Sequence, residues 1–317
     1  MSIDMTNPIF SDGEKAREHL EWIRWPDGPF CPHCGEAEKV YRLYGKSHRD
    51  GLIHCNSCNG SFTVTTGTVM ESSHVPLNKW VLAYRLMNSS KKGFSAHQLH
   101  RTIGVTYKTA WFMAHRIRES MRQNELEPMG AGGVVEIDET FIGRKDGVEV
   151  KQGVSHKRAV LTLVERHGRA RSFHIERAAK SEIMPIVREN LVRESHVMTD
   201  EAARYAKLGN EFARHDAVDH SRGEWGYTDR KTGVKINTNT VEGYYSIFKR
   251  GMTGVYQHCG EQHLHRYLAE FDFRYSNRIA LDVDDTDRTV LAIKGGHGRR
   301  LTYKPTRSAQ SPRARHL

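Results

Sequence analysis

Two pairs of cysteines have the spacing of a metal-binding module. Cys31 and Cys34 form the first pair, Cys55 and Cys58 form the second, and 20 residues separate the pairs. This pattern is typical of two hairpin-like knuckles that close on one tetrahedral zinc ion through four thiolates. Two disulfides are the alternative. The chain has only five cysteines in 317 residues, and we expect no signal peptide. Both points favour a structural zinc whose binding supplies folding energy.

Carboxylates at the ends of two predicted strands point to a different metal chemistry. Asp138 lies late in an apolar run that begins at Val134, and Asp200 ends a second strand at 196–200. If these strands are neighbours, the two carboxylates meet at one edge of the sheet, where hard oxygen ligands suit magnesium. Two such ions about 4 Å apart activate an attacking oxygen and stabilise the leaving oxygen in phosphoryl transfer. Glu139 is expected to point to the opposite side of its strand.

Glu242 supplies a third carboxylate near the start of a predicted helix. At about 100° per residue, Glu242 and Lys249 share one face of that helix. Glu242 would then complete the metal site, while Lys249 holds a DNA phosphate or a terminal hydroxyl. The alternative is a capping box, because Asn239 precedes Glu242 by three residues. The two upstream aspartates and the basic face of the helix favour the metal site.

A helical segment follows the cysteine module. We assign residues 1–70 to a zinc ribbon with an N-terminal helix, and residues 74–128 to a helical module. In the latter, one helix ends at Gly104, and Thr106 begins the next as its N-cap, which is the pattern of a helix-turn-helix. Basic residues on this last helix are the candidate DNA contacts: Lys108, Arg116 and Arg118. An ordinary three-helix bundle is the alternative.

The remaining elements predict a mixed α/β sheet. Strands at 134–140, 158–165 and 170–175 precede a helix at 182–191 and the strand at 196–200. This order is typical of a mixed sheet with helices on its faces. We assign residues 132–280 to this catalytic domain and 281–317 to a basic, disordered tail.

The composition indicates a polyanionic partner. The 48 lysines and arginines exceed the 38 acidic residues, which gives a net charge of +10 and a pI of about 9.4. Such an excess suits nucleic acid, although it serves solubility equally well. No apolar run is long enough for a membrane span, so we expect no membrane partner. His97, His100 and His156 lack the spacing of metal ligands and are interpreted as surface or DNA-facing residues.

Several motifs together resemble a known family. They are the ribbon, the segment 135–140 around Asp138, the segment 199–201 around Asp200, and the segment 237–251 around Glu242. They look like the bacterial insertion-sequence transposases of the group numbered fifteen ninety-five, and residues 265–278 are similar to that group's closing helix. The resemblance implies a ribonuclease-H-like fold and divalent-metal-dependent cutting and joining of element ends. In many members the third catalytic position is asparagine, and this sequence offers both Asn239 and Glu242. We rank Glu242 first, because a carboxylate binds magnesium more strongly than a neutral amide, and keep Asn239 as a second ligand or orienting group.

The sequence therefore predicts a DDE-type transposase. Asp138, Asp200 and Glu242 would coordinate Mg²⁺ or Mn²⁺, while Lys249 and Arg250 position DNA, mostly through phosphate contacts. The expected partners are double-stranded DNA at the element ends and at the target, and a second copy of the chain, as a homodimer or larger assembly. The expected location is the bacterial cytoplasm, on the nucleoid. The alternatives are a DNA-binding regulator without catalysis and a metal-dependent nuclease without strand transfer.

Overall fold

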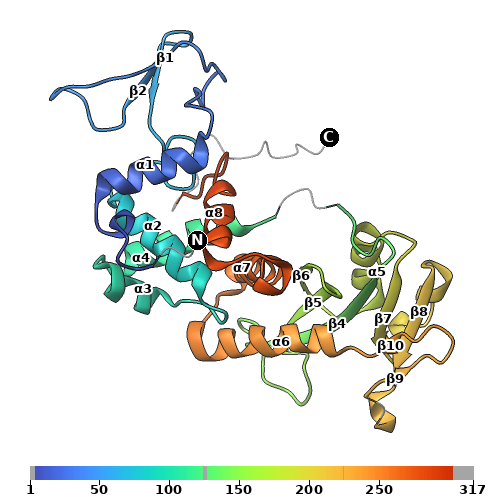
Figure 1. The fold of residues 1–317 in the computed structure, drawn as a ribbon. Coiled ribbons are helices and arrows are strands. Elements are labelled where there is room, and N and C mark those ends of the chain that lie inside the picture. The colour runs from blue at the N-terminus through green and yellow to red at the C-terminus, as the bar shows by residue number, and fades with distance from the viewer. Residues whose placement is uncertain (1–3, 124–126, 224, 303–317) are drawn as a thin grey trace, which may run out of the picture. The chain divides into compact units, whose positions relative to one another are not determined.

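Two units build the chain, and we describe each by itself. The computed structural model describes residues 4–123, 127–223 and 225–302 (Figure 1). The first unit contains the chain up to Met87, Ala96–Ser120 and the residues from Thr289 onward. The second unit contains Asn88–Ser95 and Met121–Arg288.

The first unit begins with a helix and a small sheet. Helix α1 (Gly13–Arg24) starts at Asp12, whose side chain accepts hydrogen bonds from the amides of Glu14 and Lys15. The short strands β1 (Val40–Arg42), β2 (Ile53–Cys55) and β3 (Gly60–Phe62) form an antiparallel sheet in that order. The predicted N-terminal helix is therefore present, and it precedes a sheet of three short strands.

Three helices follow in the predicted positions. They are α2 (Leu77–Ser89), α3 (Ala96–Ile103) and α4 (Tyr107–Met121). Gly104 ends α3 with a positive φ of 62°, a conformation that favours glycine. The hydroxyl of Thr106 accepts a hydrogen bond from the amide of Thr109 at 3.2 Å, as expected of an N-cap.

The expectation of a disordered tail from residue 281 is wrong for the residues that the structure describes. Helix α8 (Asp285–Lys294) buries Ala292 and Ile293. Asp284 caps this helix, because its side chain accepts hydrogen bonds from the amides of Thr286 and Asp287. The end of α8 continues into an isolated bridge between His297 and Thr68 within the first unit. The remainder of the predicted tail, 303–317, lies outside the described residues.

A five-stranded mixed sheet forms the centre of the second unit. Its strands are β4 (Val134–Ile142), β5 (Arg158–Glu165), β6 (Ala170–Ile175), β7 (His196–Asp200) and β8 (Arg214–Val218). Their spatial order is β6-β5-β4-β7-β8; β4, β7 and β8 run parallel, while β5 is antiparallel to both of its neighbours. The predicted mixed α/β sheet is therefore confirmed. Strand β8 was not predicted, because its sequence, Arg-His-Asp-Ala-Val, lacks an apolar alternation.

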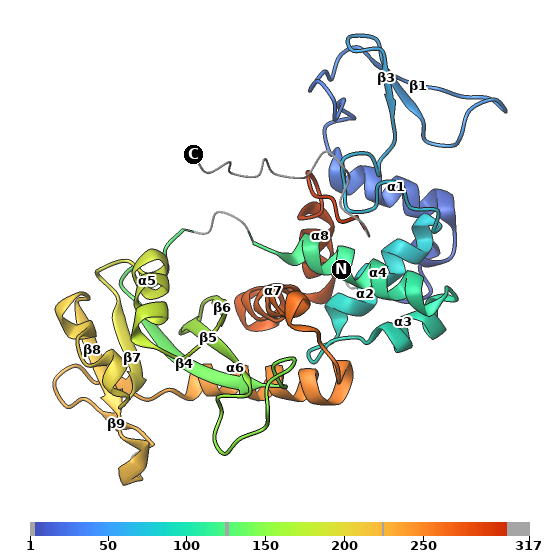
Figure 2. The ribbon, with the colours of Figure 1, turned by 180° about the vertical axis from the view of Figure 1, so that it is seen from behind.

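Helices cover both faces of this sheet, as Figures 1 and 2 show from opposite sides. Helix α5 (Lys180–Asn190) packs on one face against Val135 and Ile137 of β4. On the other face, α6 (Asn239–Gly251) and α7 (Leu264–Ser276) bury aromatic side chains against β5 and β6. Successive residues of β4 therefore face different helical layers, and Asp138 and Glu139 must lie on opposite sides.

Short elements complete the described chain. Strands β9 (Tyr227–Thr228) and β10 (Lys235–Ile236) pair as a hairpin that leads into α6. A π-helical turn, η5 (Met252–Tyr256), follows α6. The 3-10 turns are η1 (Pro8–Phe10), η2 (Ala203–Tyr205), η3 (Leu208–Asn210), η4 (His220–Arg222), η6 (Glu261–His263) and η7 (Ile279–Leu281). Among the described residues, no helix has both the length and the apolar character needed to cross a membrane.

Two glycines of α6 give a matched test of its packing. A Cβ at Gly251 would meet the carbonyl oxygen of Lys92 and the ring of Phe271, both at 2.5 Å, whereas a Cβ at Gly243 would meet nothing within 4 Å. We expect Gly251→Ala to lower the free energy of unfolding by about 1–3 kcal/mol through overpacking. Gly243→Ala should raise it by about 0.5–1 kcal/mol through helix propensity. Urea unfolding of the two variants measures both changes, and shifts of the same sign would contradict this packing.

Candidate functional site

The four cysteines converge as a tetrahedral zinc site requires. The sulfur atoms of Cys31 and Cys58 lie 3.6 Å apart, and those of Cys34 and Cys55 lie 3.7 Å apart. Zn–S bonds of about 2.3 Å in a tetrahedron place sulfur atoms about 3.8 Å apart. All five cysteines are free, so these distances are not disulfides. Four closed thiolate positions leave no room for water, and the cluster therefore suits a structural zinc.

The sheet brings the two aspartates to the same level. Val134 pairs with His196 and Glu136 with Met198 in the parallel ladder of β4 and β7. The same register, continued by two residues, places Asp138 beside Asp200, and paired residues of parallel strands face the same side of a sheet. The expected neighbourhood of the two strands is therefore present, and both carboxylates lie toward the carboxyl ends of β4 and β7.

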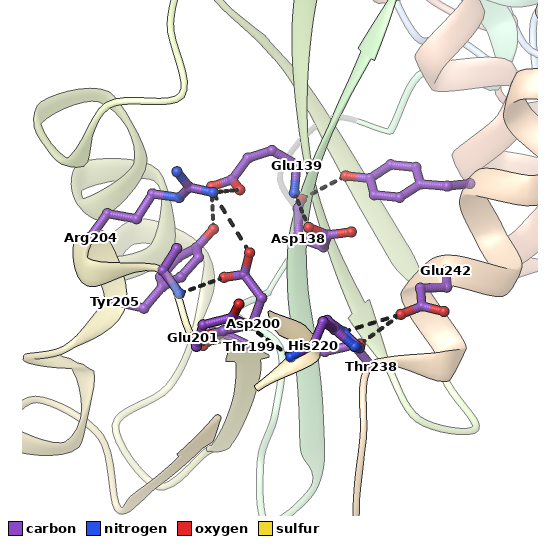
Figure 3. A network of polar contacts seen from close by, with 12 residues as sticks. Asp138, Glu139, Thr199, Asp200, Glu201, Arg204, Tyr205, His220, Thr238 and Glu242 are labelled. Carbon is purple, nitrogen blue, oxygen red and sulfur yellow. Dashed lines mark hydrogen bonds and ion pairs between the residues drawn. The ribbon is translucent and has the colours of Figure 1, made fainter. Parts of the chain in front are cut away.

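Glu242 approaches this edge from the first turn of α6. Figure 3 shows Asp138 between Asp200, on β7, and Glu242. The three do not form a closed ligand cluster. Among the described residues, only the four cysteines form a group of three or more metal-binding side chains whose ligand atoms all lie within 4.8 Å of one another.

Asp138 carries the electrostatic cost of this arrangement. Burial raises the pKa of its carboxyl to about 7. The charge of Glu139 acts in the same direction, and those of Asp200 and Glu242 add to it. The hydroxyl of Tyr245, in α6, donates a hydrogen bond to the Asp138 carbonyl oxygen at 2.6 Å, which fixes the strand against the helix.

Asp200 is held through a charged neighbour on the other side of β4. Glu139 accepts hydrogen bonds from the guanidinium of Arg204 at 2.7 Å and from the hydroxyl of Tyr205. The same guanidinium lies 3.9 Å from Oδ2 of Asp200 (Figure 3). The backbone amide of Ala202 donates to Oδ1 of Asp200 at 3.1 Å. Glu139 thus orients the arginine that neighbours a candidate metal ligand.

The surroundings of Glu242 exclude the capping-box alternative. Asn239 is the first residue inside α6, and Thr238 is the N-cap residue. The carboxylate of Glu242 accepts a hydrogen bond from the hydroxyl of Thr238 at 2.9 Å and lies 3.6 Å from Nε2 of His220. Asn239 is exposed. Glu242 is therefore available as a ligand, because it does not cap the helix.

A buried glutamate of β4 caps α6 instead. Glu136 is fully buried, and its carboxylate accepts hydrogen bonds from the backbone amides of Thr240 and Val241 at 2.7 and 3.0 Å. It also accepts hydrogen bonds from the hydroxyl of Thr240 and, at 2.6 Å, from Nε of Arg166. Arg166 in turn donates to the carbonyl oxygens of Lys235 and Asn237. We call this group, with Glu136 and Arg166 at its centre, the α6 clamp.

The candidate DNA contacts of α6 lie at its far end. Lys249 and Arg250 are both exposed. The ammonium of Lys249 lies 5.9 Å from the ring centroid of Tyr245, the side chain that reaches Asp138. Glu242 and Lys249 both lie in α6, and their common face stays a prediction.

Two of the three candidate DNA contacts on α4 are buried. Arg116 is 8% exposed, and its guanidinium donates to the carbonyl oxygens of Glu71 and Leu301. Arg118 is 2% exposed. Buried guanidinium groups do not reach a phosphate backbone, so we correct the expectation and remove both residues from the DNA-binding set. Lys108, at the start of α4, is exposed.

The donor set at the sheet edge fits a divalent cation. The three candidate ligands offer only carboxylate oxygens, which magnesium and manganese prefer. Within the described part of the chain, neither Asp138 nor Glu242 is paired with a lysine or arginine. Burial raises the pKa of Asp138 most, the neighbouring carboxylates raise it further, and a bound cation would neutralise their charge.

Sequence reasoning missed the residues that support these ligands. Glu136 and Arg166 meet across 30 positions, and Glu136 meets Val241 across 105. Nothing in a local pattern marks such partners. One signal was present: Glu136 lies between Val135 and Ile137, and a glutamate that is buried among apolar residues demands a polar partner.

The matches to known proteins fit this geometry. The ISXO2-like transposase domain matches residues 130–276, and the transposase zinc-ribbon domain matches residues 11–61. The chain belongs to the ISXO2-like transposases, the group numbered fifteen ninety-five. It is also similar to the "Uncharacterized protein in transposable element ISH50" of Halobacterium salinarum, with 29% identity over 285 residues, 84% of this chain and 91% of that protein. The family expected from the sequence motifs is confirmed.

Breaking the α6 clamp should affect both the stability of the protein and Mn²⁺ binding at the candidate carboxylate site. Glu136→Gln leaves the Arg166 charge uncompensated and should cost about 3–5 kcal/mol of stability. It should also weaken Mn²⁺ binding, measured by calorimetry below the unfolding transition, because the start of α6 and Glu242 lose their anchor. Glu270→Gln is the matched control, since it breaks another buried pair, with Arg274 in α7. The clamp has no positioning role if Glu270→Gln weakens Mn²⁺ binding as much as Glu136→Gln does.

The raised pKa of Asp138 predicts how the Mn²⁺ affinity of the candidate carboxylate site should change with pH. Below pH 7 a proton on Asp138 competes with the cation, so Mn²⁺ affinity should rise up to about tenfold per pH unit and level off above pH 7. In the metal-free protein, the same shift lowers stability as the pH rises from about 4 to about 7, because the unfolded chain loses this proton more readily. Calorimetric titrations between pH 5.5 and 8.5 test the first statement. In Asp138→Asn the slope should flatten, and a flat wild-type profile would contradict this assignment.

Proposed function

We propose that this transposase binds the ends of its insertion sequence, cleaves them and joins them to target DNA. The observation that carries the proposal is the convergence of Asp138, Asp200 and Glu242 at one edge of the sheet of an ISXO2-like transposase domain. The strand order β6-β5-β4-β7-β8, with only β5 antiparallel to its neighbours, supports the expected ribonuclease-H-like fold.

The three carboxylates would hold Mg²⁺ or Mn²⁺. These ions lower the pKa of an attacking water or 3′-hydroxyl and neutralise the charge that develops on the scissile phosphate. Asp138 and Asp200 are fixed by the sheet, and Glu242 approaches from α6. Asn239 lies one turn before Glu242 and is kept as a second ligand or orienting group. No side chain of the protein needs to act as a nucleophile.

The reaction has two steps, hydrolysis at the element end and transfer of that end to the target. Water first attacks the phosphorus at the element end, the P–O3′ bond breaks, and the leaving oxygen takes a proton to become a 3′-hydroxyl. This hydroxyl then attacks a phosphorus of the target, the new P–O bond forms, and a target 3′-hydroxyl leaves. Lys249 and Arg250 would hold the DNA backbone next to the carboxylates. We expect at least a dimer, because two element ends must be cut together.

Two alternative functions use the same chain differently. A regulator would need only the ribbon and the α3–α4 pair for DNA binding, and the carboxylates would serve the fold. A nuclease would use the carboxylates but perform only the first step. The uncompensated charge around Asp138 favours catalysis over regulation, because it destabilises the protein without a cation.

Strand transfer separates the three functions. A pre-cleaved end duplex and a target duplex are incubated with the full chain and Mg²⁺, and joined product is measured on a denaturing gel. We expect joining by the wild type and a loss of more than about 100-fold in Asp138→Asn, since even outer partners of metal ligands contribute about 10- to 100-fold.

The control is Glu189→Gln, which removes an exposed carboxylate of α5 and should retain full activity. Hydrolysis without joining would identify a nuclease, and specific binding without either reaction would identify a regulator. Activity that survives Asp138→Asn would refute the carboxylate assignment.

A further inference from the structure

A stretch of the chain that includes α2, α3 and most of α4 contains no negative charge. Residues 72–118, of which Asn88–Ser95 belong to the second unit, hold eight lysines and arginines and no aspartate or glutamate. A polyanion is the partner that such a stretch suits, provided that the basic groups are accessible. Burial therefore decides which residues contribute.

Of the basic residues on α3 and α4, two remain exposed, and they lie on adjacent parts of the two helices. Arg101 lies in the last turn of α3, and Lys108 lies in the first turn of α4. Arg116 and Arg118, further along α4, are buried. The accessible charge of this helix pair is thus gathered around the turn between α3 and α4.

Three aromatic rings gather at the same turn. The rings of His97 and Tyr107 stack with a centroid distance of 4.3 Å and an interplanar angle of 24°. His100 meets Tyr107 edge-on at 6.2 Å and lies 5.9 Å from His97. His97 is exposed, and Tyr107 is 45% exposed. The polar atoms of His97 and Tyr107 are therefore carried by side chains at the surface and not in a core.

The turn is held in place from inside the unit. Lys79 of α2 donates to the carbonyl oxygen of Gly104 at 2.9 Å, and Thr106 caps α4. The stacking of His97 on Tyr107 further joins α3 to α4. The exposed rings and charges are therefore presented by a braced turn.

We propose that the α3–α4 turn is the surface with which the first unit reads double-stranded DNA. Arg101 and Lys108 contact phosphates, while Tyr107 and His97 reach base edges, which give sequence discrimination. The inference rests on the proposed function for the identity of the DNA, the element ends. It moves the point of contact from the length of α4 to its start.

Binding without added Mg²⁺ or Mn²⁺, with the zinc of the cysteine cluster retained, tests this surface separately from catalysis. Fluorescence anisotropy of the full chain is measured on a duplex carrying the terminal repeat that flanks the coding sequence, and on a scrambled duplex of equal length. Arg101→Gln and Lys108→Gln should weaken binding to both duplexes and each reduce the salt slope by about one. Tyr107→Ala should reduce the preference for the end duplex by about fivefold or more.

Two controls lie on α1 of the same unit. Lys15→Gln removes an exposed charge and Trp22→Ala an exposed ring, and both should bind as the wild type does. Tyr107→Phe keeps the ring but not the hydroxyl, so a loss of preference there assigns discrimination to the hydroxyl. The circular dichroism of every variant is compared with that of the wild type.

The outcomes distinguish the two proposals. Wild-type binding by Tyr107→Ala, Arg101→Gln and Lys108→Gln would overturn this surface, even if the protein joins DNA normally. Equal losses in the α1 controls would also overturn it. If the wild type prefers the end duplex, the variants lose that preference, and no cleavage occurs with Mg²⁺, the surface stands and the proposed chemistry fails.

Discussion

The candidate site depends on one buried ion pair, Glu136 with Arg166. Glu136 takes the place of an N-cap for α6. The side chain of Thr238 makes no capping hydrogen bond, and the amides of Thr240 and Val241 donate to the Glu136 carboxylate instead. A strand carboxylate that caps a helix fixes both the distance and the rotation between the two elements. Glu136 is two residues before Asp138, and Val241 is one residue before Glu242, so this contact sets where the two candidate ligands stand relative to each other. An apolar contact would bury the same area but would not specify the helix register so sharply.

Two carboxylates lie on the same side of β4, and they behave differently: Glu136 is fully buried, whereas Asp138 is partly exposed. Glu136 is satisfied by a guanidinium and by backbone amides, and it stabilises the join between β4 and α6. Asp138 faces other carboxylates, and burial raises its pKa to about 7. The clamp therefore supplies the rigidity that keeps mutually repelling groups together. A site that is rigid but uncompensated is predisposed to bind a cation, since binding relieves repulsion without much rearrangement.

Local patterns predicted those parts of the fold that local patterns control. The apolar runs of β4, β5 and β7, the capped start of α4 and the cysteine spacing are written in neighbouring residues, and each appears where expected. Features that depend on distant partners were missed or misjudged.

Strand β8 is polar and forms because β7 offers it a parallel edge. Helix α8 was mistaken for a tail because the arginines that follow it dominate the composition, although Asp284 is a clear N-cap signal. The capping role of Glu136 could not be read from Asn239 and Glu242, whose spacing pointed to the wrong cap.

The fate of the arginines shows why charge alone does not locate a nucleic-acid surface. A sequence count treats every guanidinium as equal, whereas the fold assigns Arg166 to a clamp, Arg116 to backbone carbonyls and Arg204 to Glu139. A guanidinium carries five donors and keeps its charge when buried, so it serves to join segments as readily as to bind phosphate. The net charge of +10 therefore describes the whole chain but no particular face of it. What distinguishes the α3–α4 turn is that its basic groups remain exposed, its stretch of sequence contains no acid, and its aromatic rings pack on each other rather than into a core. The exposure of these groups and the absence of acidic residues from the surrounding sequence constrain the partner more tightly than the count of lysines and arginines does.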